Sequence, residues 1–363
     1  MSGPELFRNR EIVRGLADNI ARLTADLSAP LTFMEVCGTH TMAIARYGIR
    51  SLLPPEVRLI SGPGCPVCVT PIGYVDRAVA YARRPETLIV TFGDMLRVPG
   101  SSSSLMQERA RGADVRIVYS ALDAVALAAR HADRQVVFLG VGFETTAPTV
   151  AASILAADAQ GLTNYFVLGA NKTIPIPMQV LSADPAMAID GYLCPAHVST
   201  VIGAGAYRFL AEKHALPCVV TGFEPADVMH GLLMLVRQHV ERRCAVEIQY
   251  SRFVDSQGNR KAQALLDEVF IPVDTAWRGI GVIPQSGLAI TPRYAAFDAE
   301  KALPVPVEEP REAPGCLCGE VLKGKVMPPE CPLFGTVCTP EDPVGACMVS
   351  SEGSCAAAYK YGT

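Results

Sequence analysis

Two cysteines near the start of the chain have the spacing of a redox or metal-binding pair. Cys65 and Cys68 lie three positions apart in LISGPGCPVCVTP, where an apolar run should end and a helix begin. Such a pair can close a small disulfide, and a nearby helix N-terminus lowers the thiol pKa. The same spacing can chelate zinc, but no partner pair lies nearby. The spacing therefore favours a redox dithiol over a zinc site.

A third thiol, Cys37, shares the short stretch EVCGTH with His40, directly after the strand-like LTFM. A thiolate beside an imidazole suits iron, zinc or nickel, and it could equally form a Cys–His nucleophile pair. The alternative is a buried cysteine beside a surface histidine, because free cysteine is often part of a core. The residues alone leave these interpretations open.

Six more cysteines crowd the last 48 residues, at positions Cys316, Cys318, Cys331, Cys338, Cys347 and Cys355. Four of them, Cys316, Cys331, Cys338 and Cys355, are separated by fourteen, six and sixteen residues. A zinc ribbon would contain paired C-x-x-C knuckles, and this region has none. Well-separated thiols fit an iron–sulfur cluster better, with zinc and free or disulfide-bonded thiols as the alternatives.

Weaker candidates follow other predicted strands. Asp94 in FGDM and Glu144 in GVGFETTAP could enter a shared crevice or cap the next helix. Cys194 and His197 in CPAH could be metal ligands or part of a packed turn. Two cysteines are interpreted as structural, Cys218 and Cys244.

The composition narrows the class of protein. Of 363 residues, half are hydrophobic and 19% are charged, with a net charge of −4 and no Lys/Arg-rich run. This composition favours neither nucleic acid nor an anionic membrane surface as a binding partner. No apolar run approaches the roughly 20 residues of a membrane span. The N-terminus lacks the apolar core of a signal peptide. We expect a cytoplasmic protein, in which twelve cysteines indicate metal or redox chemistry rather than structural disulfides.

The elements that must position these groups alternate between strands and helices. From about Leu31 to Val273, apolar runs such as TLIVTFGD and QVVFLGVGFE alternate with amphipathic stretches such as GYVDRAVAYARR. This pattern predicts an α/β fold with two Rossmann-like parallel-sheet domains, 1–125 and 126–292. Residues 293–363 are predicted to be a Pro-rich connector, KALPVPVEEPREAPG, and a cysteine-rich iron–sulfur region too poor in aliphatic residues for its own core.

Four motifs together resemble one protein family. FMEVCGTHT, SGPGCPVCVTP, GFETTAPT and CPLFGTVCTPEDPVGACMVSSEGSCAAAYKY are similar, in this order, to those of the HypD family of nickel–iron hydrogenase maturation proteins. The resemblance implies a scaffold on which an iron ion receives two cyanide ligands and one carbon monoxide. It also implies a HypC-type chaperone and a HypE-type cyanide donor as partners, with delivery to the hydrogenase large subunit.

The resemblance also implies roles for residues. Cys37 would hold the iron, with His40 close by, and Cys65 and Cys68 would be the redox pair. A 4Fe-4S cluster would be bound by Cys316, Cys331, Cys338 and Cys355, with Cys318 and Cys347 as substitutes. Asp94 and Glu144 complete the candidate catalytic set. These roles fit an assembly factor with redox activity better than a conventional enzyme. The alternatives are a cluster-dependent thiol–disulfide oxidoreductase acting on a protein and a zinc-stabilised binding protein.

Overall fold

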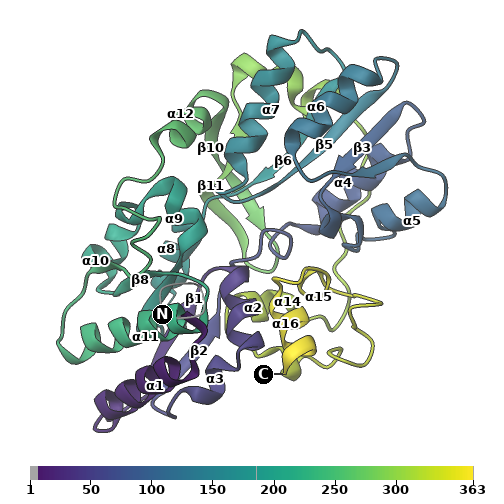
Figure 1. The fold of residues 1–363 in the computed structure, drawn as a ribbon. Coiled ribbons are helices and arrows are strands. Elements are labelled where there is room, and N and C mark those ends of the chain that lie inside the picture. The colour runs from purple at the N-terminus through teal and green to yellow at the C-terminus, as the bar shows by residue number, and fades with distance from the viewer. Residues whose placement is uncertain (1–6, 185, 363) are drawn as a thin grey trace.

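The computed structural model describes residues 7–184 and 186–362 and contains two parallel sheets (Figure 1). The first sheet has the strand order β2-β1-β7-β8-β9. Its strands are β1 (Leu31–Glu35), β2 (Val57–Ser61), β7 (Gly191–Pro195), β8 (Cys218–Thr221) and β9 (Val246–Ile248). The second has the order β4-β3-β5-β6, with β3 (Thr87–Thr91), β4 (Val115–Ile117), β5 (Gln135–Gly142) and β6 (Tyr165–Asn171). Most of these strands are apolar and buried along their length, as expected for sheets covered on both faces.

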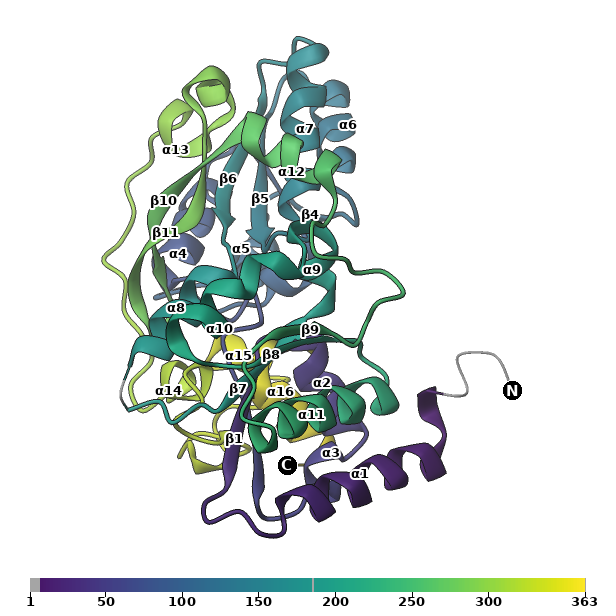
Figure 2. The ribbon, with the colours of Figure 1, turned by 90° about the vertical axis from the view of Figure 1, so that its left-hand side faces the viewer.

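Helices cover both faces of each sheet. Around the first sheet lie α1 (Arg10–Thr24), α2 (Gly38–Arg46), α3 (Ile49–Leu52), α8 (Pro175–Ala183), α9 (Ala196–Ile202), α10 (Arg208–His214) and α11 (Pro225–Val240). Around the second lie α4 (Ile72–Ala82), α5 (Leu105–Ala110), α6 (Ala121–Arg130), α7 (Ala147–Ala159) and α12 (Arg260–Val269). The view of Figure 2 separates the two groups, with β5, β6, α6 and α7 above β1, β7 and α11. The predicted α/β class with two Rossmann-like units is confirmed.

The sheets do not follow the predicted boundary at residue 125. The chain forms β1 and β2 of the first sheet, then all four strands of the second, and returns to the first at β7. Strand β7 pairs directly with β1, with Phe33 opposite Gly191. The pairing of β7 with β1 depends on packing between distant segments. It therefore cannot be predicted from a local pattern of residues.

A long antiparallel hairpin, β10 (Phe270–Trp277) and β11 (Gly281–Ile290), follows α12 and reaches toward the cysteine-rich region (Figure 1). The short elements η4 (Pro292–Phe297) and α13 (Ala299–Ala302) then lead into the Pro-rich connector. The connector is anchored, because the Arg311 N–H donates to Ser101 Oγ at 2.8 Å and Pro310 packs beside Gly73. Ser101 also donates to the Asp76 carboxylate, through its N–H and its hydroxyl.

The cysteine-rich end packs beside α2, far from it in sequence (Figure 1). Its elements are α14 (Cys318–Leu322), η5 (Pro328–Glu330), α15 (Ala346–Val349) and α16 (Ser354–Tyr361). Their buried residues belong to the same hydrophobic cluster as the inner faces of both sheets. This region therefore completes the main core, which compensates for its own low aliphatic content. No helix within residues 7–184 and 186–362 combines the length and apolar character needed to cross a membrane.

Candidate functional site

The predicted residues follow strands at the points where strand order reverses. In the first sheet the reversal lies between β1 and β7, and in the second between β3 and β5. Crevices outside the carboxyl ends of strands at such points are the usual ligand sites of open parallel sheets. Cys37 follows β1, Asp94 follows β3 in η2 (Gly93–Leu96), and Glu144 follows β5. The loop with Cys65 and Cys68 follows β2, the neighbour of β1.

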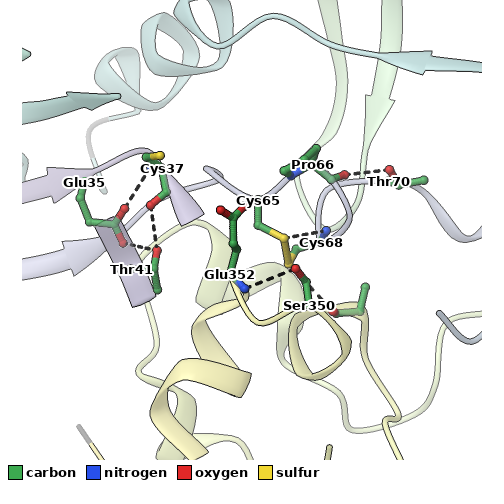
Figure 3. Close-up of a disulfide and its surroundings, with 10 residues drawn as sticks. Glu35, Cys37, Thr41, Cys65, Pro66, Cys68, Thr70, Ser350 and Glu352 are labelled. Carbon is green, nitrogen blue, oxygen red and sulfur yellow. Dashed lines mark hydrogen bonds between the residues drawn. A yellow bond between two sulfur atoms is a disulfide. The ribbon is translucent and has the colours of Figure 1, made fainter. Parts of the chain in front are cut away.

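The loops of Cys37 and of the cysteine pair touch through their backbones. The Gly38 N–H donates to the Gly64 carbonyl at 2.9 Å. A Cβ atom at Gly64 would lie 2.2 Å from the Cys37 nitrogen, so only glycine allows this approach. Figure 3 shows Cys37 and the cysteine pair on neighbouring loops. The structure thus brings together the three thiols that the sequence singled out.

Cys65 and Cys68 form a disulfide, the oxidised form of the predicted dithiol. The Cys68 N–H donates to Cys65 Sγ at 3.2 Å. Cys65 is 3% exposed and Cys68 is fully buried. On its inner side, Cys68 Sγ lies 3.9 Å from the Ala346 carbonyl oxygen, at the start of α15. The pair therefore lies between the Cys37 loop and the cysteine-rich region.

Cys37 is a buried thiol at the N-cap position of α2. Its backbone N–H donates to the buried Glu35 carboxylate at 3.0 Å, and Thr41 Oγ1 donates to the other carboxylate oxygen. Burial raises the pKa of the Cys37 thiol to about 12, and the charge of Glu352 adds to this effect. The N–H groups of His40 and Thr39 at the start of α2 act in the opposite direction. The thiol is therefore protonated at neutral pH until a cation displaces its proton.

The His40 imidazole is fully buried and directed toward β8. Its Nε2 lies 3.1 Å from the Thr221 carbonyl and 3.0 Å from that of Gly222, so Nε2 carries the hydrogen. Burial lowers the pKa of His40 to about 4, which makes the ring neutral. Nδ1 has no hydrogen-bond partner among the described residues.

Neither nitrogen of that ring is therefore hydrogen-bonded to Cys37 Sγ, and the Cys–His nucleophile pair considered from the sequence is not formed. The alternative of a surface histidine is also wrong, because His40 is completely buried. The ring instead ties the loop after β1 to the end of β8.

Glu352 is a site residue that the sequence analysis did not single out. It lies in the loop between α15 and α16, and its Oε1 accepts a hydrogen bond from Thr39 Oγ1 at 2.6 Å. A Cβ at Gly38 would be 2.5 Å from the Glu352 Cβ. Burial raises the pKa of Glu352, and the exposed Asp94 adds to this. One signal in the sequence could have pointed to Glu352: it lies in the polar stretch SSEG, residues 350–353, between the predicted ligands Cys338 and Cys355.

Glu144 is buried and contacts a helix start. Its Oε1 accepts the Ile174 N–H at 2.9 Å, at the beginning of α8, so it caps that helix rather than the next one, α7. Burial raises the pKa of this carboxyl to about 7. In the part of the chain that the structure describes, its Oε2 has no partner.

The cysteine-rich region contains one pocket lined by thiols. The cysteines that line it are Cys316, Cys318, Cys331, Cys338 and Cys355, together with the apolar side chains of Leu333, Phe334 and Met348. All four predicted cluster ligands are among them, and so is the substitute Cys318. The other substitute, Cys347, is completely buried and interacts with Cys318 and Cys355.

The thiols around this pocket match in type the ligands of a 4Fe-4S cluster, in which each thiolate binds a separate iron. Across the described residues, no three His, Cys, Asp or Glu side chains are grouped closely enough to hold one metal ion. Two observations fit such a cluster: a Cβ at Gly345 would lie 2.8 and 2.9 Å from the sulfurs of Cys318 and Cys316, and a buried N–H of Arg278 nearby has no acceptor within the described chain.

The weaker CPAH candidates are not brought together. Cys194 is buried on β7 and interacts with Cys218 of the neighbouring strand β8. His197 is exposed, and its ring packs against that of Phe223 at a tilt of 35°, with 4.1 Å between the centroids. Cys218 is buried as expected for a structural thiol, whereas Cys244 is exposed.

The family model HypD, described as "Hydrogenase formation hypA family", matches residues 11–362. A hydrogenase maturation factor HypD of Rhizobium leguminosarum bv. viciae is 48% identical over 98% of this chain and 94% of its own length. The Rhodobacter capsulatus protein of the same name is 47% identical over 98% of this chain and 97% of its own. That of Escherichia coli K12 is 46% identical over 97% and 94%.

Proposed function

The chain belongs to the HypD family of hydrogenase maturation factors, and from this we propose that it serves in the cytoplasm as a scaffold for assembling the iron centre of nickel–iron hydrogenase. The cargo is an iron ion that receives two cyanide ligands and one carbon monoxide. A HypC-type chaperone and a HypE-type cyanide donor are the proposed partners, and the hydrogenase large subunit is the recipient.

One observation carries the proposal most directly, the backbone contact between the loops of Cys37 and of the cysteine pair. Cys37 is the proposed holder of the iron, because a soft thiolate suits iron with strong-field ligands. Iron binding displaces the proton of this thiol, whose pKa is about 12. The pair Cys65 and Cys68 is the proposed source of electrons beside it.

The electron balance gives the cysteine pair a defined task. Cyanide arrives as a thiocyanate on a cysteine of the donor protein, and its release as an anion needs two electrons. When reduced, Cys65 and Cys68 supply them: their S–S bond forms, the S–CN bond of the donor breaks, and two protons leave the dithiol. One proton goes to the donor sulfur and the other is released to solvent, so the cyanide binds the iron as an anion.

The thiols Cys316, Cys331, Cys338 and Cys355, with Cys318 as a substitute, would hold a 4Fe-4S cluster. When bound, such a cluster supplies single electrons. Cys68 contacts Ala346, and the neighbouring Gly345 packs on the sulfurs of Cys316 and Cys318. This short path supports re-reduction of the disulfide from the cysteine-rich side.

The test is infrared spectroscopy of the complex with the chaperone, purified without oxygen. We expect Cys37→Ala to remove the cyanide and carbonyl bands while the visible absorption of the cluster stays. Cys244→Ala, at an exposed thiol outside the crevice, is the control that should retain both. Intact bands in the Cys37→Ala complex would contradict the role of Cys37.

A cluster-dependent thiol–disulfide oxidoreductase is the second candidate, because the disulfide lies next to the thiol-lined pocket. Burial of both sulfurs does not separate the two functions, because a protein substrate and the thiocyanate of the donor protein would both have to reach Cys65 and Cys68 through their covering loops. Iron analysis separates the two functions. A reductase contains four irons per chain and tolerates Cys37→Ala, whereas the loaded scaffold contains more iron, which that substitution removes.

A further inference from the structure

The tip of the β10–β11 hairpin lies between the cysteine pair and the thiol-lined pocket. The Arg278 N–H donates to the carbonyl of Val69, the residue after Cys68, at 2.9 Å. Next to it, Gly279 lies against Gly319, so closely that a Cβ at Gly279 would be 2.1 Å from the Gly319 Cα. Gly319 directly follows Cys318. The tip therefore contacts both redox sites of the proposed function.

The Arg278 side chain is buried and only partly paired. It is 3% exposed, and its Nη2 and Nε donate to Glu312 Oε2 at 2.7 and 3.2 Å. Its Nη1 is buried and has no acceptor in the described residues. A buried donor without a partner costs about 1–3 kcal/mol, more when the group is charged. This N–H is therefore available to an acceptor that binds in the functional state.

The thiols of the pocket are close enough to feel this charge. Burial lowers the pKa of Arg278, but the Glu312 carboxylate outweighs burial, and negative charge on Cys318 and Cys347 adds to its effect, so the pKa is raised. Glu312 is 53% exposed, so solvent screens its charge more than that of Arg278.

We propose that Arg278 favours electron uptake at the thiol-lined pocket, because it holds a buried positive charge close to Cys318. The proposal rests on the proposed function, in which this pocket holds a 4Fe-4S cluster. An external one-electron donor adds one negative charge there, and no proton needs to move. Attraction to Arg278 stabilises that added charge, which raises the midpoint potential.

The experiment is a redox titration of the anaerobically purified full-length protein, with dithionite as reductant and electron paramagnetic resonance as readout. Arg278→Met keeps the apolar stem and removes the charge. At a fixed applied potential we expect the ratio of reduced to oxidised cluster to fall about tenfold, a shift of about 59 mV for one electron. Arg278→Lys keeps the charge and should show a smaller shift.

Glu312→Gln is the matched opposite change at a half-exposed position, where misfolding is not expected. Removing this negative charge should raise the midpoint potential. An unchanged midpoint potential in Arg278→Met would overturn the role of Arg278. If Arg278→Met does not hold a cluster, an unchanged midpoint potential in Glu312→Gln would overturn it instead. A wild-type protein without cluster absorption would instead overturn the proposed function itself, so the two failures are distinguishable.

Discussion

At the level of single residues, the proton of Cys37 is controlled by groups from both ends of the chain. Burial and the charge of Glu352 hold the proton on the sulfur, whereas the N–H groups at the start of α2 favour its loss. Glu352 reaches this position through Thr39 and the side-chain-free Gly38. The cysteine-rich region thus influences the proton of the proposed iron-holding thiol, in addition to its proposed role in binding a cluster.

The first prediction concerns this charge. Glu352→Gln should lower the pKa of Cys37, because a neutral amide no longer opposes the thiolate. The pH profile of Cys37 alkylation, measured by mass spectrometry of the labelled peptide in iron-free protein, should shift to lower pH. Glu341→Gln, in an exposed loop of the same region, is the control and should leave the profile in place. An identical profile for Glu352→Gln would contradict the assignment.

Glu144 gives a second prediction, on stability against pH. Its folded pKa of about 7 lies above the ordinary value of 4.5, so the unfolded chain ionises first as pH rises. Stability from this group is therefore present below about pH 4.5 and is lost between pH 4.5 and 7, by an amount on the order of 3 kcal/mol. Glu144→Gln keeps an acceptor for the Ile174 N–H and should remove this slope.

Urea midpoints of the wild type and Glu144→Gln, measured at pH 5, 6 and 7, check this. The difference between the two proteins isolates Glu144 from buried His40, whose lowered pKa makes stability fall toward low pH in both. A difference that does not change with pH would contradict the raised pKa of Glu144.

At the level of elements, the contact between the loops after β1 and β2 depends on Gly64. A methyl group there meets the backbone of Cys37, which cannot move aside as a side chain can. We expect Gly64→Ala to destabilise the protein by about 1–3 kcal/mol and to separate the two loops. Urea denaturation measures the first effect. Gly15→Ala is the control, because it lies in α1 with no atom near its added Cβ and should be neutral or stabilising.

Local patterns predict the individual elements well. Runs such as Thr87–Thr91 and Cys218–Thr221 are strands because they are apolar throughout, and Cys65 and Cys68 lie between a strand and a helix as expected. Local sequence patterns cannot predict contacts that depend on tertiary packing. Glu352 and Arg278 reach the site from distant segments, so neither was predicted. The orientation of His40 was missed for the same reason, since the carbonyls that hold it follow β8.

At the level of the whole molecule, the segment that forms the second sheet is inserted between two parts of the chain that form the first sheet. The four strands of the second sheet are contiguous, whereas those of the first come from both sides of that insertion. The predicted unit 1–125 therefore contains β1 and β2 without β7, and β3 and β4 without β5. Each sheet would lose its central pairing in such a fragment.

We therefore expect the fragment 1–125 to lack a cooperative unfolding transition when followed by circular dichroism. The fragment 84–184, which contains all four strands of the second sheet, is the comparison and should retain more ordered structure. Cooperative unfolding of 1–125 would instead support the boundary predicted from the sequence.

The docking of the final segment beside α2 has a consequence for biosynthesis. Cys37, Cys65 and Cys68 leave the ribosome early, and the segment that covers them begins near Cys316. At a synthesis rate of roughly 5–20 residues per second, the segment that covers these thiols is made on the order of 10–50 s after them. During synthesis these sulfurs are therefore exposed for a time to oxidants and metal ions, and the crevice can close only after the segment that begins near Cys316 has been made.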